Sequence, residues 1–248
     1  MGAFHEGHLE LMRQARTLCD TVYVSLFVNP TQFAPNEDFS AYPRDEDRDF
    51  ALAAEQGVDV MFAPPVEEIY TDEVTAVTVA DVSSLWEGES RPGHFDGVAT
   101  VVNRLFEIFE PDKAIFGLKD LQQCAVVRKL VSDRSLPIDI VTVETVREPS
   151  GLALSSRNSY FNSDQRERAS FLYKCLKRFV ALSGENRTNA LTVNDTIVEL
   201  ESHGFKVEYL ARVDPVTMKQ AVVESKDDRL ICAARFEGVR LIDNVPCQ

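Results

Sequence analysis

The sequence has few positive charges for the number of negative charges it carries. It contains 26 lysines and arginines against 40 aspartates and glutamates, which gives a formal net charge of −14. A protein that binds nucleic acid over a broad surface needs a basic face to displace the counterions around the phosphates. The composition therefore argues against a nucleic-acid partner, while a local basic cluster can still bind a small anion.

Cysteine and long apolar runs are scarce as well. The five cysteines are odd in number and widely spaced, without a Cys-x-x-Cys pair, which argues against a disulfide framework or a zinc site and favours a reducing compartment. No apolar run approaches the length of a membrane span, and no basic and apolar leader opens the chain. We therefore expect a cytoplasmic protein without a membrane partner.

Short β-branched apolar runs alternate with amphipathic stretches through the first part of the chain. The predicted buried strands are residues 21–30, 58–65, 112–120 and 138–146, and the predicted helices between them are residues 9–19, 44–56 and 97–110. This alternation predicts an α/β fold with a doubly wound, parallel, Rossmann-like sheet.

The pattern changes after residue 146, where a polar connection begins. Two amphipathic helices are predicted at residues 164–182 and 190–203, followed by three short antiparallel strands. We therefore expect two domains, a nucleotide-binding domain at 1–146 and a smaller α+β domain at 147–248.

Two of the four histidines, His5 and His8, lie three residues apart at the start of the first predicted helix. Residues at this spacing share a helix face, and a helix N-terminus offers free N–H groups and partial positive charge to a phosphate. The pair can donate hydrogen bonds to a nucleotide phosphate or stabilise negative charge in a transition state. A metal site is an alternative that lacks an obvious third ligand, and a pair without function is another.

Polar side chains follow two of the predicted strands, where open α/β sheets bind their ligands. Asn29 and Gln32 lie at the carboxyl end of the first strand, and Lys119, Gln122 and Gln123 lie at that of the third. A lysine suits a phosphate, and a glutamine both donates and accepts hydrogen bonds, which suits a hydroxyl or a carboxylate. Ordinary turn chemistry and surface exposure are the structural alternatives.

Two further loops carry cationic side chains. Arg91 and His94 precede a helix that Asp96 is expected to cap, and they can face an anion or serve the cap alone. Residues 155–157, Ser-Ser-Arg, lie at the domain boundary. Such a segment can close over a polyphosphate as a mobile lid, although a solvated linker has the same composition. His203, at a helix end, is expected to be structural.

Six sequence blocks together resemble the pantoate–β-alanine ligase (pantothenate synthetase) family. They are MGAFHEGH, FVNPTQF, YPR, RPGHFDGV, FGLKD.QQ and TVRE..GLALSSRN, in that family's order and spacing. HEGH resembles the HIGH motif of the nucleotidyltransferase superfamily, and LSSRN occupies the place of its KMSKS loop. The resemblance covers nearly the whole chain and is weaker after about residue 165.

The resemblance implies a two-step, AMP-forming ligase. ATP and pantoate give pantoyl adenylate and pyrophosphate, and the amine of β-alanine then displaces AMP. Mg²⁺ is expected with the ATP, and a homodimer is implied. Two alternatives remain open at this point: another HIGH-type nucleotidyltransferase, and a non-catalytic nucleotide-binding remnant of such an enzyme.

The resemblance also implies roles for individual residues. His8, His5, Lys119 and Arg157 would be catalytic, Gln32 and Gln123 would hold pantoate, and Gln32 would also hold β-alanine. No protein ligand for a metal is implied. The residues implied to contact ATP are Met1, Gly2, Ala3, Phe4, His5, Glu6, Gly7, His8, Gly117, Leu118, Lys119, Asp120, Val146, Leu154, Ser155, Ser156 and Arg157.

The chain departs from the family pattern at two places. Leu118 stands where the family usually has glutamate, which puts any role of that position in doubt. The family also has a strand and a Pro-Thr pair before the Met-Gly at which this sequence starts. We therefore expect a sheet without its first strand, with lower stability and activity than the full architecture.

Overall fold

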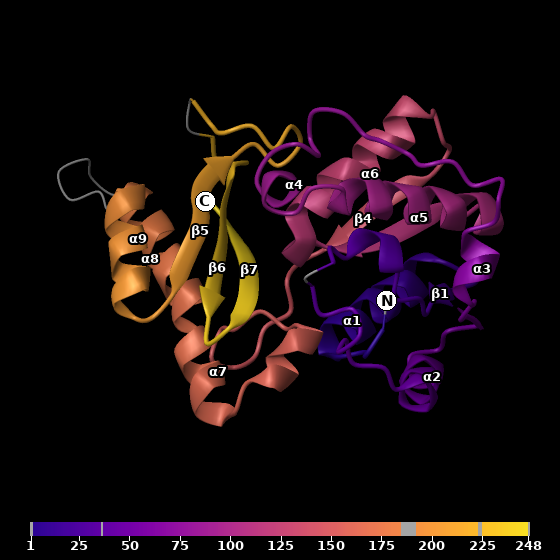
Figure 1. The fold of residues 1–248 in the computed structure, drawn as a ribbon, viewed down its shortest axis with the longest axis horizontal. Coiled ribbons are helices and arrows are strands. Elements are labelled where there is room, and N and C mark those ends of the chain that lie inside the picture. Colours follow the sequence, from indigo (N-terminus) through magenta and orange to yellow (C-terminus); the bar gives the residue numbers. More distant parts are fainter. Residues whose placement is uncertain (1, 36, 185–191, 223–224, 248) are drawn as a thin grey trace. The chain divides into compact units, whose positions relative to one another are not determined.

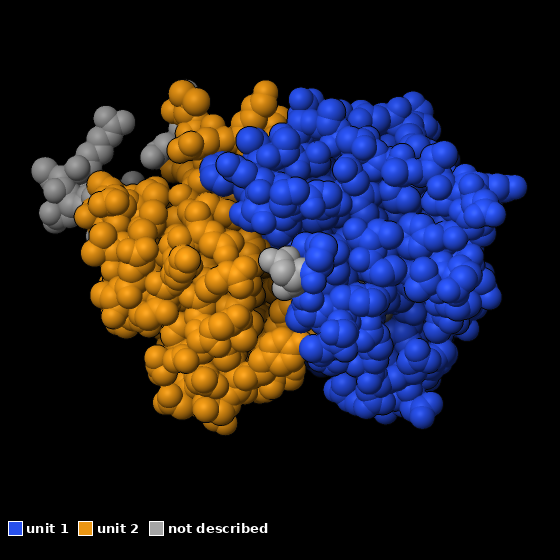
Figure 2. Space-filling view, in the orientation of Figure 1, with its two compact units in different colours: residues 1–118, 122–144 blue, residues 119–121, 145–248 orange. Residues whose placement is uncertain are grey.

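A computed structural model describes residues 2–35, 37–184, 192–222 and 225–247. The chain forms two compact units, coloured separately in Figure 2. Residues 1–118 and 122–144 belong to the first unit, and residues 119–121 and 145–248 belong to the second. No helix within the described ranges is both long and apolar enough to cross a membrane.

Strands and helices alternate up to Glu144, as Figure 1 shows from indigo to pink. The strands are β1 (Tyr23–Ser25), β2 (Val60–Phe62), β3 (Lys113–Gly117) and β4 (Asp139–Val143). The helices are α1 (Glu6–Leu18), α2 (Glu46–Glu55), α3 (Val66–Ile69), α4 (Glu87–Ser90), α5 (His94–Phe109) and α6 (Leu121–Asp133), with 3-10 turns η1 (Pro30–Gln32) and η2 (Leu118–Asp120).

The strands of the first unit form two parallel pairs. β1 pairs with β2, with Tyr23 opposite Val60, and β3 pairs with β4, with Lys113 opposite Asp139. Parallel pairing with intervening helices confirms the predicted α/β class. Apolar side chains at helical spacing on α1, such as Leu9 and Met12, are buried in a core with the loop before the helix and with β1.

The second unit contains a three-stranded antiparallel sheet and three helices. Its helices are α7 (Ser163–Ala169), α8 (Phe171–Gly184) and α9 (Val193–Ser202), preceded by the 3-10 turn η3 (Ser156–Tyr160), and its strands are β5 (Lys206–Val213), β6 (Arg229–Phe236) and β7 (Val239–Pro246). The sheet has the order β5-β6-β7, which confirms the three predicted antiparallel strands. Helices α8 and α9 pack on it over a shared apolar core.

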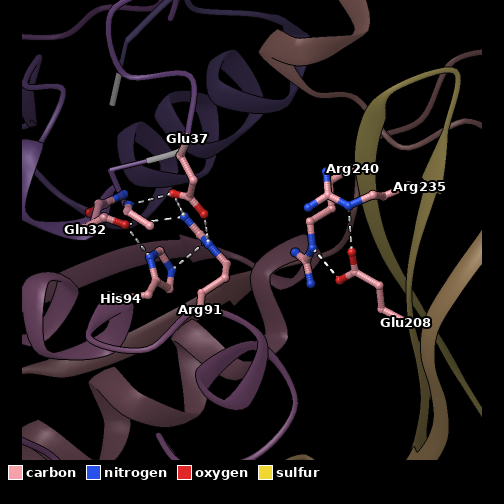
Figure 3. A network of polar contacts seen from close by, with 8 residues as sticks. Gln32, Glu37, Arg91, His94, Glu208, Arg235 and Arg240 are labelled. Carbon is pink, nitrogen blue, oxygen red and sulfur yellow. Dashed lines mark hydrogen bonds and ion pairs between the residues drawn. The ribbon is translucent and has the colours of Figure 1, made fainter.

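A tight hairpin and a glutamate shared by two arginines stabilise this sheet. The β6–β7 hairpin turns at Glu237 and Gly238, both with positive φ (48° and 82°), the combination that a tight two-residue hairpin requires. On β5, Glu208 accepts hydrogen bonds from Arg235 and Arg240 at 2.9 and 2.8 Å (Figure 3, right). The glutamate therefore links all three strands.

Two local predictions are wrong. The helix predicted at 164–182 is divided into α7 and α8, because the Ser170 hydroxyl donates to the Glu167 carbonyl at 2.6 Å and ends the first helix. Asp96 does not cap α5. That helix begins at His94 after Gly93, whose φ of 81° is left-handed, and Asp96 lies in its first turn.

Candidate active site

The loop before α1 is held by a buried carboxylate on α2. The backbone N–H groups of Ala3 and Phe4 donate to Asp49 at 2.8 and 2.6 Å. Only 1% of Asp49 is exposed, and Ala3 has a φ of 51°, a conformation uncommon outside glycine. Asp49 therefore fixes the backbone that leads into His5. Asp49 could not be predicted from the sequence, because a charged residue on a charged helix gives no signal of burial.

His5 and His8 lie together at the N-terminus of α1. His5 caps the helix: its Nδ1 accepts the Gly7 N–H at 3.1 Å, and Nδ1 of His8 accepts the His5 N–H at 3.3 Å. The rings are stacked with centroids 4.1 Å apart. An accepting Nδ1 carries no proton, so the proton of each neutral ring is on Nε2. Both rings can therefore donate a hydrogen bond from Nε2.

The other predicted residues of this segment form the frame of the loop. Phe4 is buried in the core of the first unit, and a side chain at Gly2 would come within 3.0 Å of Val28. Glu6 forms an ion pair with Arg13 on α1. Met1, which is also predicted to contact ATP, lies outside the described residues.

Gln32 ends the turn η1, and its amide is oriented by Asn29. The Asn29 amide nitrogen donates to Gln32 Oε1 at 3.2 Å and to the Gly97 carbonyl at 3.1 Å. Its oxygen accepts the Tyr70 hydroxyl at 2.5 Å. Because the Asn29 orientation is fixed from both ends, Gln32 turns its carbonyl toward Asn29 and keeps its NH₂ group to donate elsewhere.

The backbone of Gln32 is held by a second network, shown on the left of Figure 3. Arg91 donates to both carboxylate oxygens of Glu37 at 2.6 and 2.8 Å. Its third nitrogen lies 3.0 Å from His94 Nε2, and His94 Nδ1 lies 2.9 Å from the Gln32 carbonyl. Arginine only donates, so Nε2 of His94 accepts and its Nδ1–H donates to Gln32.

Burial and the Arg91 charge favour the neutral form of His94. Burial, followed by the nearby Arg91 charge, lowers the pKa of His94 below its usual value. Burial opposes ionisation of Glu37, but the Arg91 hydrogen bonds and charge together hold the pKa of Glu37 below its usual value. Arg91 and His94 thus hold the Gln32 loop, which is neither of the two roles that the sequence offered for them, and an anion contact stays a prediction.

The two neighbouring glutamines at the start of α6 differ in their surroundings. Gln122 is buried and donates to the carbonyls of Val82 and Leu85 at 2.8 and 2.7 Å, while its oxygen accepts the Glu87 N–H at 3.0 Å. Its amide hydrogens and oxygen are thus engaged in holding the chain before α4. Gln122 therefore has a structural role. Gln123 is partly exposed beside it, and its contact with a ligand stays a prediction.

In the second unit, the predicted ATP residues after β4 form a compact hairpin. The Val146 carbonyl accepts the Leu154 N–H at 3.0 Å. Gly151 turns the hairpin with a φ of 99°, and a side chain there would come within 2.5 Å of the Tyr173 ring. The Ser155 hydroxyl accepts the Arg157 N–H at 3.3 Å and caps η3. Val146 and residues 154–157 are therefore brought together.

The predicted ATP residues are divided between the two units. The first unit contains the predicted residues from Gly2 to His8, Gly117 at the end of β3, and Leu118. The second unit contains Lys119 and Asp120, which lie in η2, together with Val146 and residues 154–157. Among the described residues, no group of three or more His, Cys, Asp or Glu side chains is placed to hold a metal ion.

The model of the pantoate-beta-alanine ligase family matches residues 1–246. The chain belongs to this family. The predicted family and enzyme class, an ATP-dependent ligase, are confirmed, and the match favours the ligase over the two alternatives.

Relatives and solved structures agree over nearly the full length. Pantothenate synthetase of Chloroflexus aurantiacus (strain J-10-fl) is 48% identical over 250 residues, which is 98% of this chain and 88% of the relative. That of Chlorobium phaeovibrioides is 45% identical, over 98% of this chain and 85% of the relative.

Two crystal structures of family members have the same fold. Pantothenate synthetase of Thermus thermophilus has a TM-score of 0.91 and 45% identity, covering 100% of this chain and 91% of that one. Pantoate-beta-alanine ligase of Francisella tularensis, complexed with beta-gamma ATP and beta-alanine, has a TM-score of 0.83 and 34% identity, covering 100% of this chain and 87% of that one.

Proposed function

We propose that the chain condenses pantoate with β-alanine at the expense of ATP, through a pantoyl-adenylate intermediate, and releases pyrophosphate and AMP. The observation that carries this function is the paired arrangement of His5 and His8. Their Nδ1 atoms accept backbone N–H groups at the N-terminus of α1, so each neutral ring carries its N–H donor at Nε2. Such donors, beside a helix dipole, suit the phosphates of ATP.

The first step moves negative charge onto the departing pyrophosphate. The pantoate carboxylate attacks the α-phosphorus, the bond to the β-phosphate oxygen breaks, and pyrophosphate leaves. His8, His5, Lys119 and Arg157 are proposed to stabilise that charge. The second step transfers the pantoyl group to the β-alanine amine, which loses a proton as AMP leaves. No covalent enzyme intermediate is required, so positioned donors supply most of the rate.

Gln32 and Gln123 are proposed to bind pantoate, and Gln32 also β-alanine. Asn29 fixes the Gln32 amide so that its NH₂ group is the donor, which suits the carboxylate or hydroxyl oxygens of pantoate. The remaining described residues that are proposed to surround ATP are Gly2, Ala3, Phe4, Glu6, Gly7, Gly117, Leu118, Asp120, Val146, Leu154, Ser155 and Ser156.

Mg²⁺ is proposed to arrive with ATP. This ion keeps several waters and is commonly held by substrate phosphates with one or two carboxylates. The described residues contain no cluster of three metal-binding side chains, which fits an ion held mainly by the phosphates. The ion would neutralise charge on the departing pyrophosphate.

The two parallel pairs of the first unit are proposed to form one doubly wound, Rossmann-like sheet. Two contacts support this: α1 packs against β3, while Gly2 approaches Val28, just after β1. A crystal structure tests the proposal, and two separate two-stranded sheets would contradict it.

The second unit, predicted as 147–248, is proposed to cover bound ATP, and the protein is proposed to be a cytoplasmic homodimer. The cover over ATP is supported by the polar hairpin that ends in Ser155, Ser156 and Arg157, because its hydroxyls and guanidinium suit a polyphosphate. Sizing with light scattering tests the dimer, and protection of this hairpin from proteolysis by ATP tests the cover.

Isotope exchange tests the proposed first step directly. Radiolabelled pyrophosphate should enter ATP when pantoate is present, without β-alanine, because adenylate formation is reversible. Exchange without pantoate, or exchange that requires β-alanine, would contradict the adenylate mechanism.

A further inference from the structure

Two consecutive residues of β7, Asp243 and Asn244, are buried although both are polar. They are 4% and 2% exposed. Such groups are rarely buried without hydrogen-bond partners. Neighbouring residues of a strand point to opposite faces of the sheet, so the two side chains reach two different segments of the second unit.

Asn244 holds the backbone of Lys119. Its amide nitrogen donates to the Lys119 carbonyl at 3.2 Å. Its oxygen accepts from Nε of the buried Arg229 at 2.6 Å. Because arginine only donates, Arg229 fixes which end of the amide is the oxygen, and the NH₂ group must face Lys119.

Asp243 holds the hairpin that contains Val146 and Leu154. Its carboxylate pairs with the Arg147 guanidinium through two hydrogen bonds of 2.6 and 2.8 Å. Arg147 also donates to the Gly151 carbonyl at 3.2 Å, across the hairpin turn.

Three further contacts lock this ion pair. The Arg147 guanidinium stacks 3.9 Å above the Tyr173 ring and donates to the Asn244 carbonyl at 3.2 Å. The Asn244 N–H donates back to Asp243 at 2.7 Å. A bidentate, stacked arginine has one geometry, so the start of the hairpin has one position relative to β7.

We propose that Asp243 and Asn244 are positioning residues that set the Lys119 turn and the hairpin 146–157 in a fixed relation to each other for ATP. This inference rests on the proposed ATP contacts of these two segments. The Lys119 ammonium and the Ser155–Arg157 donors are useful only if they meet the same phosphates, and small misplacements of such groups are costly to the reaction.

Asn244→Asp and Asp243→Asn test the pair separately. Asn244→Asp keeps the Arg229 contact but turns a carboxylate oxygen toward the Lys119 carbonyl. Asp243→Asn replaces one Arg147 acceptor with a donor. Each variant is expected to raise the KM for ATP roughly tenfold or more, because positioning at this scale has effects of that size. The KM for pantoate is expected to stay within about twofold.

Asp228→Asn is the matched control. Asp228 is a buried carboxylate of the same unit, paired with Arg212 at 2.9 Å, and it also accepts the Ser225 N–H. This control should lower the melting temperature to a similar degree without raising the KM for ATP. If all three variants have the same KM for ATP, Asp243 and Asn244 have only a structural role and the inference is wrong.

Two further variants keep the test decisive. Arg147→Lys retains the charge but loses the bidentate geometry, so it replaces the Asp243 variant if that variant does not fold. An unchanged KM for ATP would overturn the inference.

Lys119→Ala separates the proposed ATP contact of Lys119 from the positioning role of Asn244. If it leaves ATP binding unchanged by calorimetry, the ATP assignment itself fails. If it weakens binding while Asn244→Asp does not, only the positioning inference fails.

Discussion

The carboxylate of Asp49 accepts the backbone N–H of Phe4 at 2.6 Å, although the two residues are 45 positions apart in the sequence. The contact connects α2 to the loop before the paired histidines. It also pins a left-handed Ala3, so the loop has a defined conformation before any ligand arrives. Histidine donors on a loop that is already fixed lower the barrier of the reaction, because they need no rearrangement during it.

Asp49→Asn should therefore impair both stability and ATP use. The variant places an amide NH₂ group against one of two backbone N–H donors, and a buried donor without a partner costs about 1–3 kcal/mol. We expect a lower free energy of unfolding and a higher KM for ATP, measured by denaturant titration and steady-state kinetics. Asp47→Asn, an exposed position on the same helix, is the control and should change neither.

The tautomers of His5 and His8 lead to a second prediction. His8→Asn keeps an acceptor near the position of Nδ1 and so preserves the cap, but it removes the Nε2–H donor. We expect normal folding with kcat reduced by about 10²-fold or more, the usual effect of losing one charge-stabilising donor. A variant with unchanged kcat would show that the ring does not act on the reacting phosphates. His203→Asn, which changes a histidine in the second unit, should keep normal kcat.

The orientation of the Gln32 amide is expected to affect the KM for pantoate. Asn29→Asp keeps the acceptor for the Tyr70 hydroxyl but turns an oxygen toward Gln32. Gln32 should then rotate its amide and present its carbonyl to the ligand. We expect the KM for pantoate to rise by roughly tenfold, the effect of about one lost hydrogen bond to a charged group. An equal rise in the KM for ATP would instead indicate general damage to the loop.

Because His94 is neutral in the folded protein, we expect the protein to lose stability in acid. The pKa of this buried ring lies below its ordinary value of 6.5, so below that pH the unfolded chain binds a proton that the folded chain does not. Stability from this group is therefore complete above pH 6.5 and is lost as the pH falls below it. Protonation also removes the acceptor that faces Arg91, with Glu37 and Glu87 as the nearby opposing charges.

Denaturant unfolding at pH 7.5 and 5.5 measures this effect. The wild type should lose more stability between the two values than His94→Asn, which cannot titrate but can still donate to the Gln32 carbonyl. If both lose the same amount, His94 is not the responsible group.

Local patterns in the sequence predicted most secondary structure and the family's motif residues. The apolar runs located all four parallel strands, but β1 and β2 are much shorter than their runs, because apolar content marks burial rather than strand pairing. The division at Ser170 depends on one side-chain hydrogen bond. The His5–His8 spacing predicted a shared face, which the stacked rings display.

The residues that hold the site could not be found in this way. Asp49 resembles any charged residue of a solvated helix, and Asp243 and Asn244 resemble the end of an ordinary strand. The segments that they hold, at Phe4, Arg147 and Lys119, lie 45 or more positions away in the sequence, and only the tertiary fold brings them together. The contacts of His94 with Arg91 and the Gln32 carbonyl likewise depend on the tertiary fold.

Formation of AMP and pantothenate from ATP, Mg²⁺, pantoate and β-alanine tests the central claim most directly. The purified protein should release one AMP for each pantothenate formed, and omission of either pantoate or β-alanine should abolish that release. Folded protein that forms no pantothenate, or that retains the nucleotide on its product, would contradict the account.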